Sequence, residues 1–194
     1  MAGDKYSSFK DLAAAEVRGT DYDTEWRRKP GSSVAVIAPH GGKIEPLTDK
    51  IADAIAGKDF SFYCFRGLKA KGGLHVASHL FDDPDCERLI ADHAYVVSIH
   101  GWGELSERLC VGGLDNDLME ALRKSLAENG IRVERAGVGL GAADARNIVN
   151  RGATGRGVQF ELTKGFRTNA AKRRIFVGVV RAVLHDAQQV RQCR

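Results

Sequence analysis

Two histidines and one glutamate in this chain stand where they could share a metal ion. His40 and His100 each follow an apolar run of strand length, each is followed by glycine, and Glu45 comes five residues after His40. Two imidazoles and one carboxylate form a zinc site that keeps a fourth position open for water. Zinc lowers the pKa of such a water to about 7. The pattern therefore predicts a metal-dependent hydrolase.

Glu161 is a candidate for the general base that activates the attacking water. In the run Val158-Gln159-Phe160-Glu161-Leu162, apolar and polar residues alternate, so Gln159 and Glu161 share one face of a predicted strand. A carboxylate within an apolar strand needs a partner or a task. Partial burial would raise its pKa toward the range of a useful base. The alternative is a solvent-facing carboxylate on an edge strand.

Three arginines and one histidine are candidates for contacts with the substrate. Arg151 lies in a polar, glycine-bounded stretch and could polarise the scissile carbonyl and stabilise the developing oxyanion. With Arg146 and Arg167 it could also bind a substrate carboxylate through paired N–H groups. His75 is a candidate for a supporting or substrate contact. Ordinary surface roles stay open for each of these residues.

The elements that must position these residues alternate as in an α/β domain. Apolar runs predict strands at 33–38, 60–65, 94–99, from 131 and at 158–162. Helices are expected from a cap at Thr48 to Gly57, from 83 to 90, from a cap at Asp115 to Gly130, and from 168 onward with Ile175, Val179 and Val183 on one face. We predict an open, mixed, mainly parallel sheet flanked by helices on both faces. The ligand crevice of such a sheet lies beyond the carboxyl ends of its strands, so His40 and His100 would face it together.

Composition bounds the class of protein. The 194 residues, 43% hydrophobic and 28% charged, predict a single domain over 1–194, with 1–31 as an N-terminal arm. No apolar run approaches the ~20 residues of a membrane span, and the first residues carry no secretion signal. The four cysteines form no C-x-x-C pair, so we expect free thiols in a reducing, cytoplasmic compartment and no thiolate zinc site. We expect a monomer that binds an acidic substrate and neither a membrane nor a nucleic acid.

Two other classes of protein compete with the hydrolase. The run 137–142 fits the G-x-G-x-x-A pattern of a dinucleotide site, with Glu161 roughly 20 residues on. Such a site needs a helix directly after the glycines, and the asparagines and glycines that follow are poor helix formers. A nucleic-acid-binding module has only the net charge of +4 and the basic run 172–174 behind it. It would leave the two strand-end histidines unexplained.

Several stretches, taken together, resemble the phage and bacterial poly-γ-glutamate hydrolase family. The most specific are His40-Gly41-Gly42-Lys43-Ile44-Glu45 and Gly157-Val158-Gln159-Phe160-Glu161. Supporting stretches lie at 4–6, 74–75, 81–82, 98–101, 112–115 and 147–151, so the resemblance runs in order from about residue 4 to residue 167. One departure is Leu47, where relatives tend to have glycine after Glu-Pro. Another is the segment 76–79, which carries an additional histidine.

The resemblance implies a core related to that of the zinc carboxypeptidases and cleavage of the γ-linked amide backbone of poly-γ-glutamate. It implies Zn²⁺ held by His40, Glu45 and His100, with Glu161 as the acid/base residue. It also places Asn150 and Arg151 beside the substrate. Members of the family serve phages in passing a bacterial capsule, so release by phage lysis is one expected route out of the cell. Another acidic amide, such as an N-acyl amino acid or a γ-glutamyl link of peptidoglycan, remains an open alternative.

Overall fold

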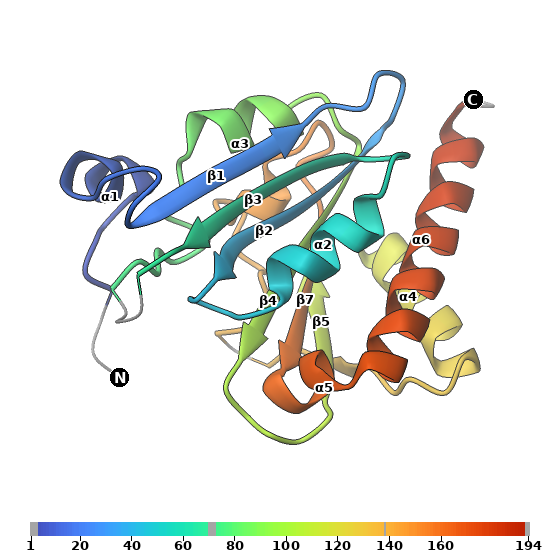
Figure 1. Ribbon diagram of the computed structural model, residues 1–194. Coiled ribbons are helices and arrows are strands. Elements are labelled where there is room, and N and C mark those ends of the chain that lie inside the picture. Colours follow the sequence, from blue (N-terminus) through green and yellow to red (C-terminus); the bar gives the residue numbers. More distant parts are fainter. Residues whose placement is uncertain (1–3, 70–72, 138, 193–194) are drawn as a thin grey trace.

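A seven-stranded open sheet forms the centre of the molecule, and helices cover both of its faces (Figure 1). The computed structural model describes residues 4–69, 73–137 and 139–192. The strands are β1 Tyr22–Arg27, β2 Val34–Gly42, β3 Ser61–Gly67, β4 Tyr95–Trp102, β5 Leu109–Gly113, β6 Glu134–Arg135 and β7 Val158–Thr163. The helices are α1 Phe9–Ala15, α2 Thr48–Ala56, α3 Pro84–Ile90, α4 Asn116–Glu128, the 3₁₀ turn η1 Ile148–Asn150, α5 Lys164–Thr168 and α6 Ala170–Gln192.

The sheet is mixed and mainly parallel, as predicted. Its strand order is β1-β3-β2-β4-β7-β5-β6. The four central strands β3, β2, β4 and β7 run parallel, whereas β1 pairs antiparallel with β3 and β5 pairs antiparallel with β7. Parallel strands need covered crossover connections, which accounts for helices on both faces.

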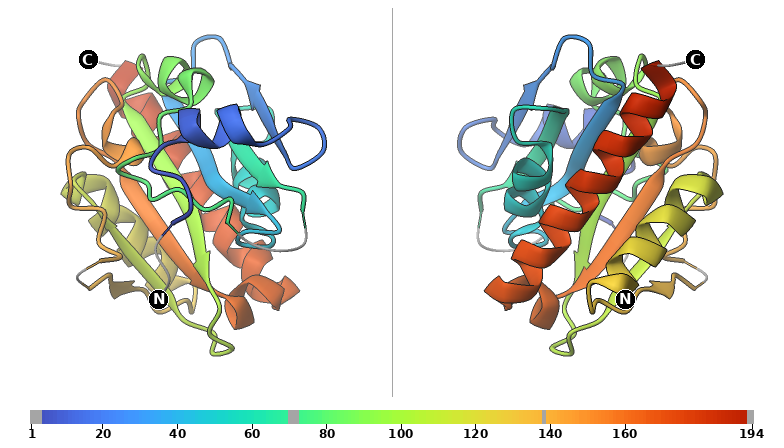
Figure 2. Two further views of the ribbon diagram at one scale, coloured as in Figure 1. Left: turned by 90° about the vertical axis from the view of Figure 1, so that its left-hand side faces the viewer. Right: turned by 90° about the vertical axis from the view of Figure 1, so that its right-hand side faces the viewer.

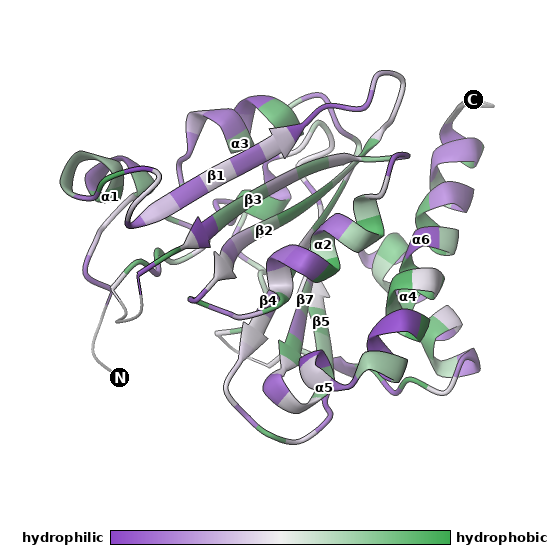
Figure 3. Ribbon diagram, viewed as in Figure 1, coloured by the Kyte–Doolittle hydropathy of each residue, from purple (hydrophilic) through white to green (hydrophobic). Residues whose placement is uncertain are grey.

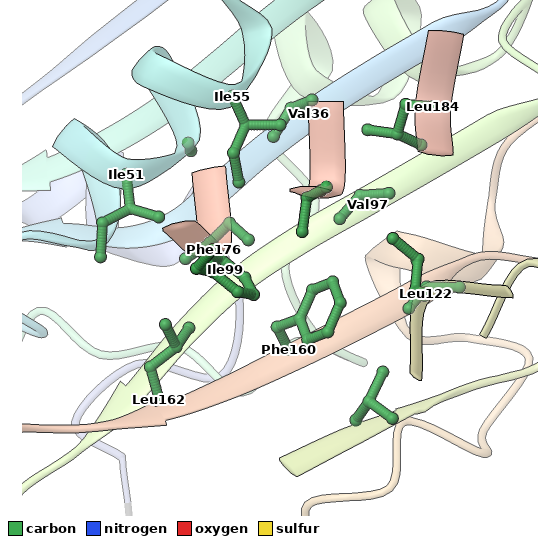
Figure 4. Close-up of a cluster of buried hydrophobic side chains, with 14 of the residues drawn as sticks. Val36, Ile51, Ile55, Val97, Ile99, Leu122, Phe160, Leu162, Phe176 and Leu184 are labelled. Carbon is green, nitrogen blue, oxygen red and sulfur yellow. The ribbon is translucent and has the colours of Figure 1, made fainter. Parts of the chain in front are cut away.

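The central strands are apolar on both sides because each side of the sheet packs against its own helices. Val36, Val97 and Phe160 belong to the core on the side of α2, α4 and α6, where Figure 4 shows them beneath residues of α2 and α6. Ile37 and Val96 belong to the opposite core, which α1, α3 and η1 cover. Figure 2 shows the two helical layers from either side. Burial on both faces explains why these strands read as continuous apolar runs.

The predicted helix starts hold at two places and shift at a third. Asp83 caps α3 by accepting from the N–H of Asp85, and Asp115 caps α4 by accepting from the N–H of Leu118. The cap of α2 is Leu47, not Thr48, and it has a φ of 79°. This left-handed conformation favours glycine, which the family resemblance leads one to expect at this position.

The buried face of α6 differs from the predicted one. Ile175 is 43% exposed, and the fully buried residues are Phe176, Val180 and Leu184, together with the mostly buried Val179. Figure 3 shows apolar and polar colours mixed along α6, as expected of an amphipathic helix. The prediction was wrong by a rotation of one residue, because a separate short helix, α5, precedes α6 and resets where α6 begins.

The first 31 residues contribute more than an arm. They contain α1 and the edge strand β1, which pairs with β3 from Tyr22 opposite Gly67 to Arg27 opposite Phe62. The side chain of Phe9 is buried in the core on this side of the sheet. The polar sequence of β1 hid it, because an edge strand exposes much of its surface. A second strand is displaced: β6 occupies 134–135 rather than starting at Ile131, which is buried ahead of it.

The glycine-rich run at 137–142 does not form a dinucleotide-binding turn in the described residues. No α-helix follows it, and the next helical element is the 3₁₀ turn η1. Gly112 and Gly113 instead pack closely on this run, and the N–H of Gly113 donates to the carbonyl of Gly141. Within the described ranges, no helix combines the length and apolar character needed to cross a bilayer.

Candidate active site

The strand order creates a crevice between β2 and β4. The chain leaves β2 through α2 on one face of the sheet to reach β3, and returns through α3 on the other face to reach β4. Because these two connections lead to opposite faces, the carboxyl ends of β2 and β4 diverge, which is where ligands bind in open α/β sheets. His40 lies at the end of β2 and His100 near the end of β4.

A β-bulge turns His40 toward His100. Against β3, the register passes from Ala38 opposite Cys64 to Gly41 opposite Arg66, so β2 carries one extra residue at this point. Without the bulge, His40 would share the face of Ala38 beneath α2. The extra residue moves it to the other face, where the side chain of His100 also lies.

The structure brings His40, Glu45 and His100 into one cluster. The Nδ1 atom of His40 lies 3.2 Å from Oε1 of Glu45 and 3.1 Å from Nδ1 of His100. The Nδ1 atom of His100 is 3.8 Å from Oε2 of Glu45, which accepts a 2.9 Å hydrogen bond from the N–H of Gly101. One potential ligand atom from each of the three residues lies within 4.8 Å of the other two. Both histidines are buried.

The chemistry of this cluster suits a divalent cation. His40 donates its Nε2–H to the carbonyl of Val76 at 2.8 Å, so its Nδ1 presents a lone pair to the cluster. Burial lowers the pKa of His100 to about 3, which leaves that imidazole neutral. Its Nε2 is buried without a partner among the described residues, so the Nδ1 side is the one with neighbours. Two imidazole lone pairs and a carboxylate aimed at one point are the donor set that zinc prefers.

Glu161 lies on β7 directly beside the cluster. It is opposite His100 in the parallel register, and its side chain is buried on the same face of the sheet. Burial, reinforced by the negative charge of Glu45, raises the pKa of Glu161 from its ordinary 4.5 to about 8. A carboxyl with such a pKa can accept and return a proton near neutral pH.

Two amide side chains hold Glu161 in place, and the sequence did not assign a task to either. Gln159 donates its Nε2–H to Oε1 of Glu161 at 2.8 Å. The Oε1 atom of Gln159 accepts in turn from Nδ2 of Asn147 at 3.3 Å. The available signal was the alternation in β7, which places Gln159 and Glu161 on the same face of the strand.

Arg167 is buried beside the cluster, where it connects three segments. Its Nε donates to the carbonyl of Pro46 at 2.9 Å, and its Nη1 donates to the carbonyls of Trp102, at 3.3 Å, and Leu162. Burial lowers the pKa of Arg167, while the nearby carboxylates of Glu45 and Glu161 oppose that shift. The guanidinium thus ties the loop after Glu45 to the ends of β4 and β7.

We expect Gly101→Ala to destabilise the protein by about 2–4 kcal/mol. An added Cβ would overlap the Nη1 and Cζ atoms of Arg167, so the guanidinium would leave its buried carbonyl partners. Denaturant unfolding measures the effect. Gly103→Ala is the matched control, because a Cβ there meets no atom within 4 Å. Equal stabilities of the two variants would contradict this account of Arg167.

The other predicted substrate residues make contacts elsewhere in the fold. Arg151 binds Oε1 of Glu87 at 2.7 Å and the carbonyls of His79, Phe81 and Arg146. Arg146 pairs with Asp144, and Asn150 donates to the carbonyls of Ala142 and Asp144 and accepts from the N–H of Gly157. These contacts anchor the loops around η1. Roles for these three residues at the substrate stay predictions.

His75 lies at the wall of a cavity that opens beside the cluster. Its ring centroid is 4.1 Å from that of His40, and its Nδ1 lies 2.7 Å from Oδ1 of Asp4, near the N-terminus. The cavity has a volume of about 350 Å³, and its wall is formed by Lys43, Ile44, Glu45, Lys69, Gly73, Leu74, His75 and Gly101. The cluster therefore has an open side where a substrate can approach.

Comparison with known proteins places the chain in a family. A profile of the poly-γ-glutamate hydrolase family matches residues 6–178. The UPF0714 protein YmaC of Bacillus subtilis (strain 168) is 35% identical over 165 residues, which cover 83% of this chain and 69% of that protein. The chain spans between 60% and 69% of the length of the curated relatives YmaC, YndL and YoqZ.

Two solved structures are similar over nearly the whole chain. The structure of a bacteriophage poly-γ-glutamate hydrolase superposes with a TM-score of 0.90 at 29% identity, covering 97% of this chain and 100% of that one. A zinc-free apo structure of YndL superposes with a TM-score of 0.88 at 30% identity, covering 95% of this chain and 99% of that one. The chain therefore belongs to the poly-γ-glutamate hydrolase family of amide-bond hydrolases.

Proposed function

We propose that the protein is a zinc-dependent hydrolase of the γ-linked amide backbone of poly-γ-glutamate. The observation that carries the proposal is the buried cluster of His40, Glu45 and His100 with the carboxyl of Glu161 on the adjacent strand. Membership in the poly-γ-glutamate hydrolase family supports the choice of substrate. The existence of a zinc-free form of a relative supports the choice of metal.

The side chains divide the work of hydrolysis. Zinc, when bound, polarises the scissile carbonyl and makes water more acidic. Glu161 accepts a proton from the attacking water as the new C–O bond forms, and donates it to the amide nitrogen as the C–N bond breaks. Gln159 orients the carboxylate that performs both transfers. The positive charge of Arg167 offsets the two carboxylates of the site.

Viscosity of a poly-γ-glutamate solution tests this function. The purified protein is expected to lower the viscosity, to stop doing so after treatment with a chelator, and to recover when zinc is restored. Poly-α-glutamate is the matched substrate, because it has the same charge and composition with a different backbone linkage. Viscosity loss that persists without metal would contradict zinc dependence. Loss with the α-linked polymer alone would contradict the proposed substrate.

A further inference from the structure

The cavity beside the metal cluster carries two lysines for which the proposed reaction has no use. Lys43 lies two residues before Glu45, and Lys69 lies two residues after β3 ends at Gly67. Strands β2 and β3 run parallel, with Gly42 opposite Gly67. The N–H of Lys43 donates to the carbonyl of Gly67 at 2.9 Å, which fixes the two segments together. Both lysines therefore leave the same edge of the sheet and flank one opening.

Positive charge exceeds negative charge around this opening. The buried carboxylate of Glu16 pairs with Lys69 and, at 3.1 Å, with Nζ of Lys5, so one anion serves two lysines. Asp4 is engaged by His75. The side chain of Lys43 is exposed and makes no ion pair with any residue that the structure describes. Glu45, the remaining anion of the wall, belongs to the metal cluster. An anionic group entering the cavity would meet uncompensated cations.

The lysines and Glu161 lie on opposite sides of the cluster. In the strand order β3-β2-β4-β7, the lysines follow β3 and β2, the proposed metal ligands lie at β2 and β4, and Glu161 is on β7. An amide at the metal cluster would thus have the proton-transferring carboxyl on one side and the two lysines on the other. Since Glu161 must reach the leaving nitrogen, the lysines face the acyl part of the substrate.

We infer that Lys43 and Lys69 form a carboxylate-binding subsite for the acyl side of the substrate. The inference rests on the proposed function. A γ-linked glutamyl unit carries a free α-carboxylate at the far end of a short alkyl chain from its scissile carbonyl, and the cavity offers both the room and the charge for it. Lysine suits this task because its flexible stem and point charge accept a carboxylate in many orientations. Repeated carboxylates along a polymer would bind where a neutral amide would not.

Binding and kinetics of Lys43→Gln test the subsite. Calorimetry in the inactive Glu161→Gln background is expected to show about fivefold weaker binding of a poly-γ-glutamate oligomer when Lys43 is also replaced, the size of effect typical of an exposed charge pair. In the active enzyme, the same change should raise KM by a similar factor and leave kcat unchanged. A polymer whose α-carboxylates are methyl-esterified should be handled equally by both proteins. Lys124→Gln, an exposed lysine on α4, is the matched control and should change nothing.

The outcomes separate this inference from the proposed function. Unchanged affinity and KM in Lys43→Gln, in a protein that cleaves poly-γ-glutamate, would overturn the subsite alone. An equal loss in Lys124→Gln would also overturn it, because the effect would then be one of general charge. A wild-type protein that neither binds nor cleaves the polymer would overturn both.

Discussion

Replacing Glu161 with glutamine is expected to lower the rate of amide hydrolysis by about 10³-fold, within the range that general acid–base catalysis contributes. Glutamine has nearly the same shape, and its side-chain oxygen can still accept from Gln159, but it cannot take up a proton from water. The change should leave zinc affinity intact, because Glu161 is outside the three-residue cluster. Steady-state kinetics and elemental analysis measure the two effects. Glu128→Gln, at the exposed end of α4, is the control and should keep full activity. Retained activity in the Glu161 variant would remove its assigned role.

The same variant should be more stable than the wild type at alkaline pH when metal is absent. The pKa of Glu161 rises from 4.5 to about 8 in the folded protein because of burial. The folded state therefore favours the protonated carboxyl, and this contribution to stability is complete below pH 4.5 and is lost as the pH rises toward 8. Each pKa unit corresponds to about 1.4 kcal/mol. Denaturant unfolding at pH 5 and pH 9 should show a stability gap between the variant and the wild type that opens with pH. A gap that does not depend on pH would contradict the buried, protonated state.

Replacing His100 with alanine is expected to weaken zinc binding by at least about 100-fold, more than is usual for the loss of a supporting contact. The variant removes one of two imidazoles and leaves Glu45 and His40 with an incomplete donor set. Hydrolysis should fall in parallel with zinc content. His79→Ala removes an exposed histidine outside the cluster and serves as the control. A His100 variant that purifies with a full equivalent of zinc would show that this imidazole is not a ligand.

The sequence was informative about the central strands and the residues at their ends. Continuous apolar runs marked β2 and β4, because strands covered on both faces admit few polar residues. Two histidines after such strands, followed by glycine, pointed to one crevice, and the structure places them 3.1 Å apart at their Nδ1 atoms. Alternation in β7 put Glu161 and Gln159 on one face, and there they form a hydrogen bond.

Features that depend on tertiary context escaped sequence reasoning. The bulge that turns His40 toward the site is set by pairing with β3, and no local pattern in β2 encodes the extra residue. The edge strand β1 is too polar to give a strand signal. Arginines look alike in sequence, yet Arg167 is buried beside the cluster while Arg151 pairs with Glu87 on α3. Only packing separates these two cases.

The account depends above all on one metal ion shared by two loops. Diffraction data collected at the zinc absorption edge, from crystals of the protein purified with zinc, test this most directly. We predict one strong anomalous peak within bonding distance of Nδ1 of His40, Nδ1 of His100 and a carboxylate oxygen of Glu45. A peak bound by other residues, or no peak in protein that hydrolyses poly-γ-glutamate, would contradict it.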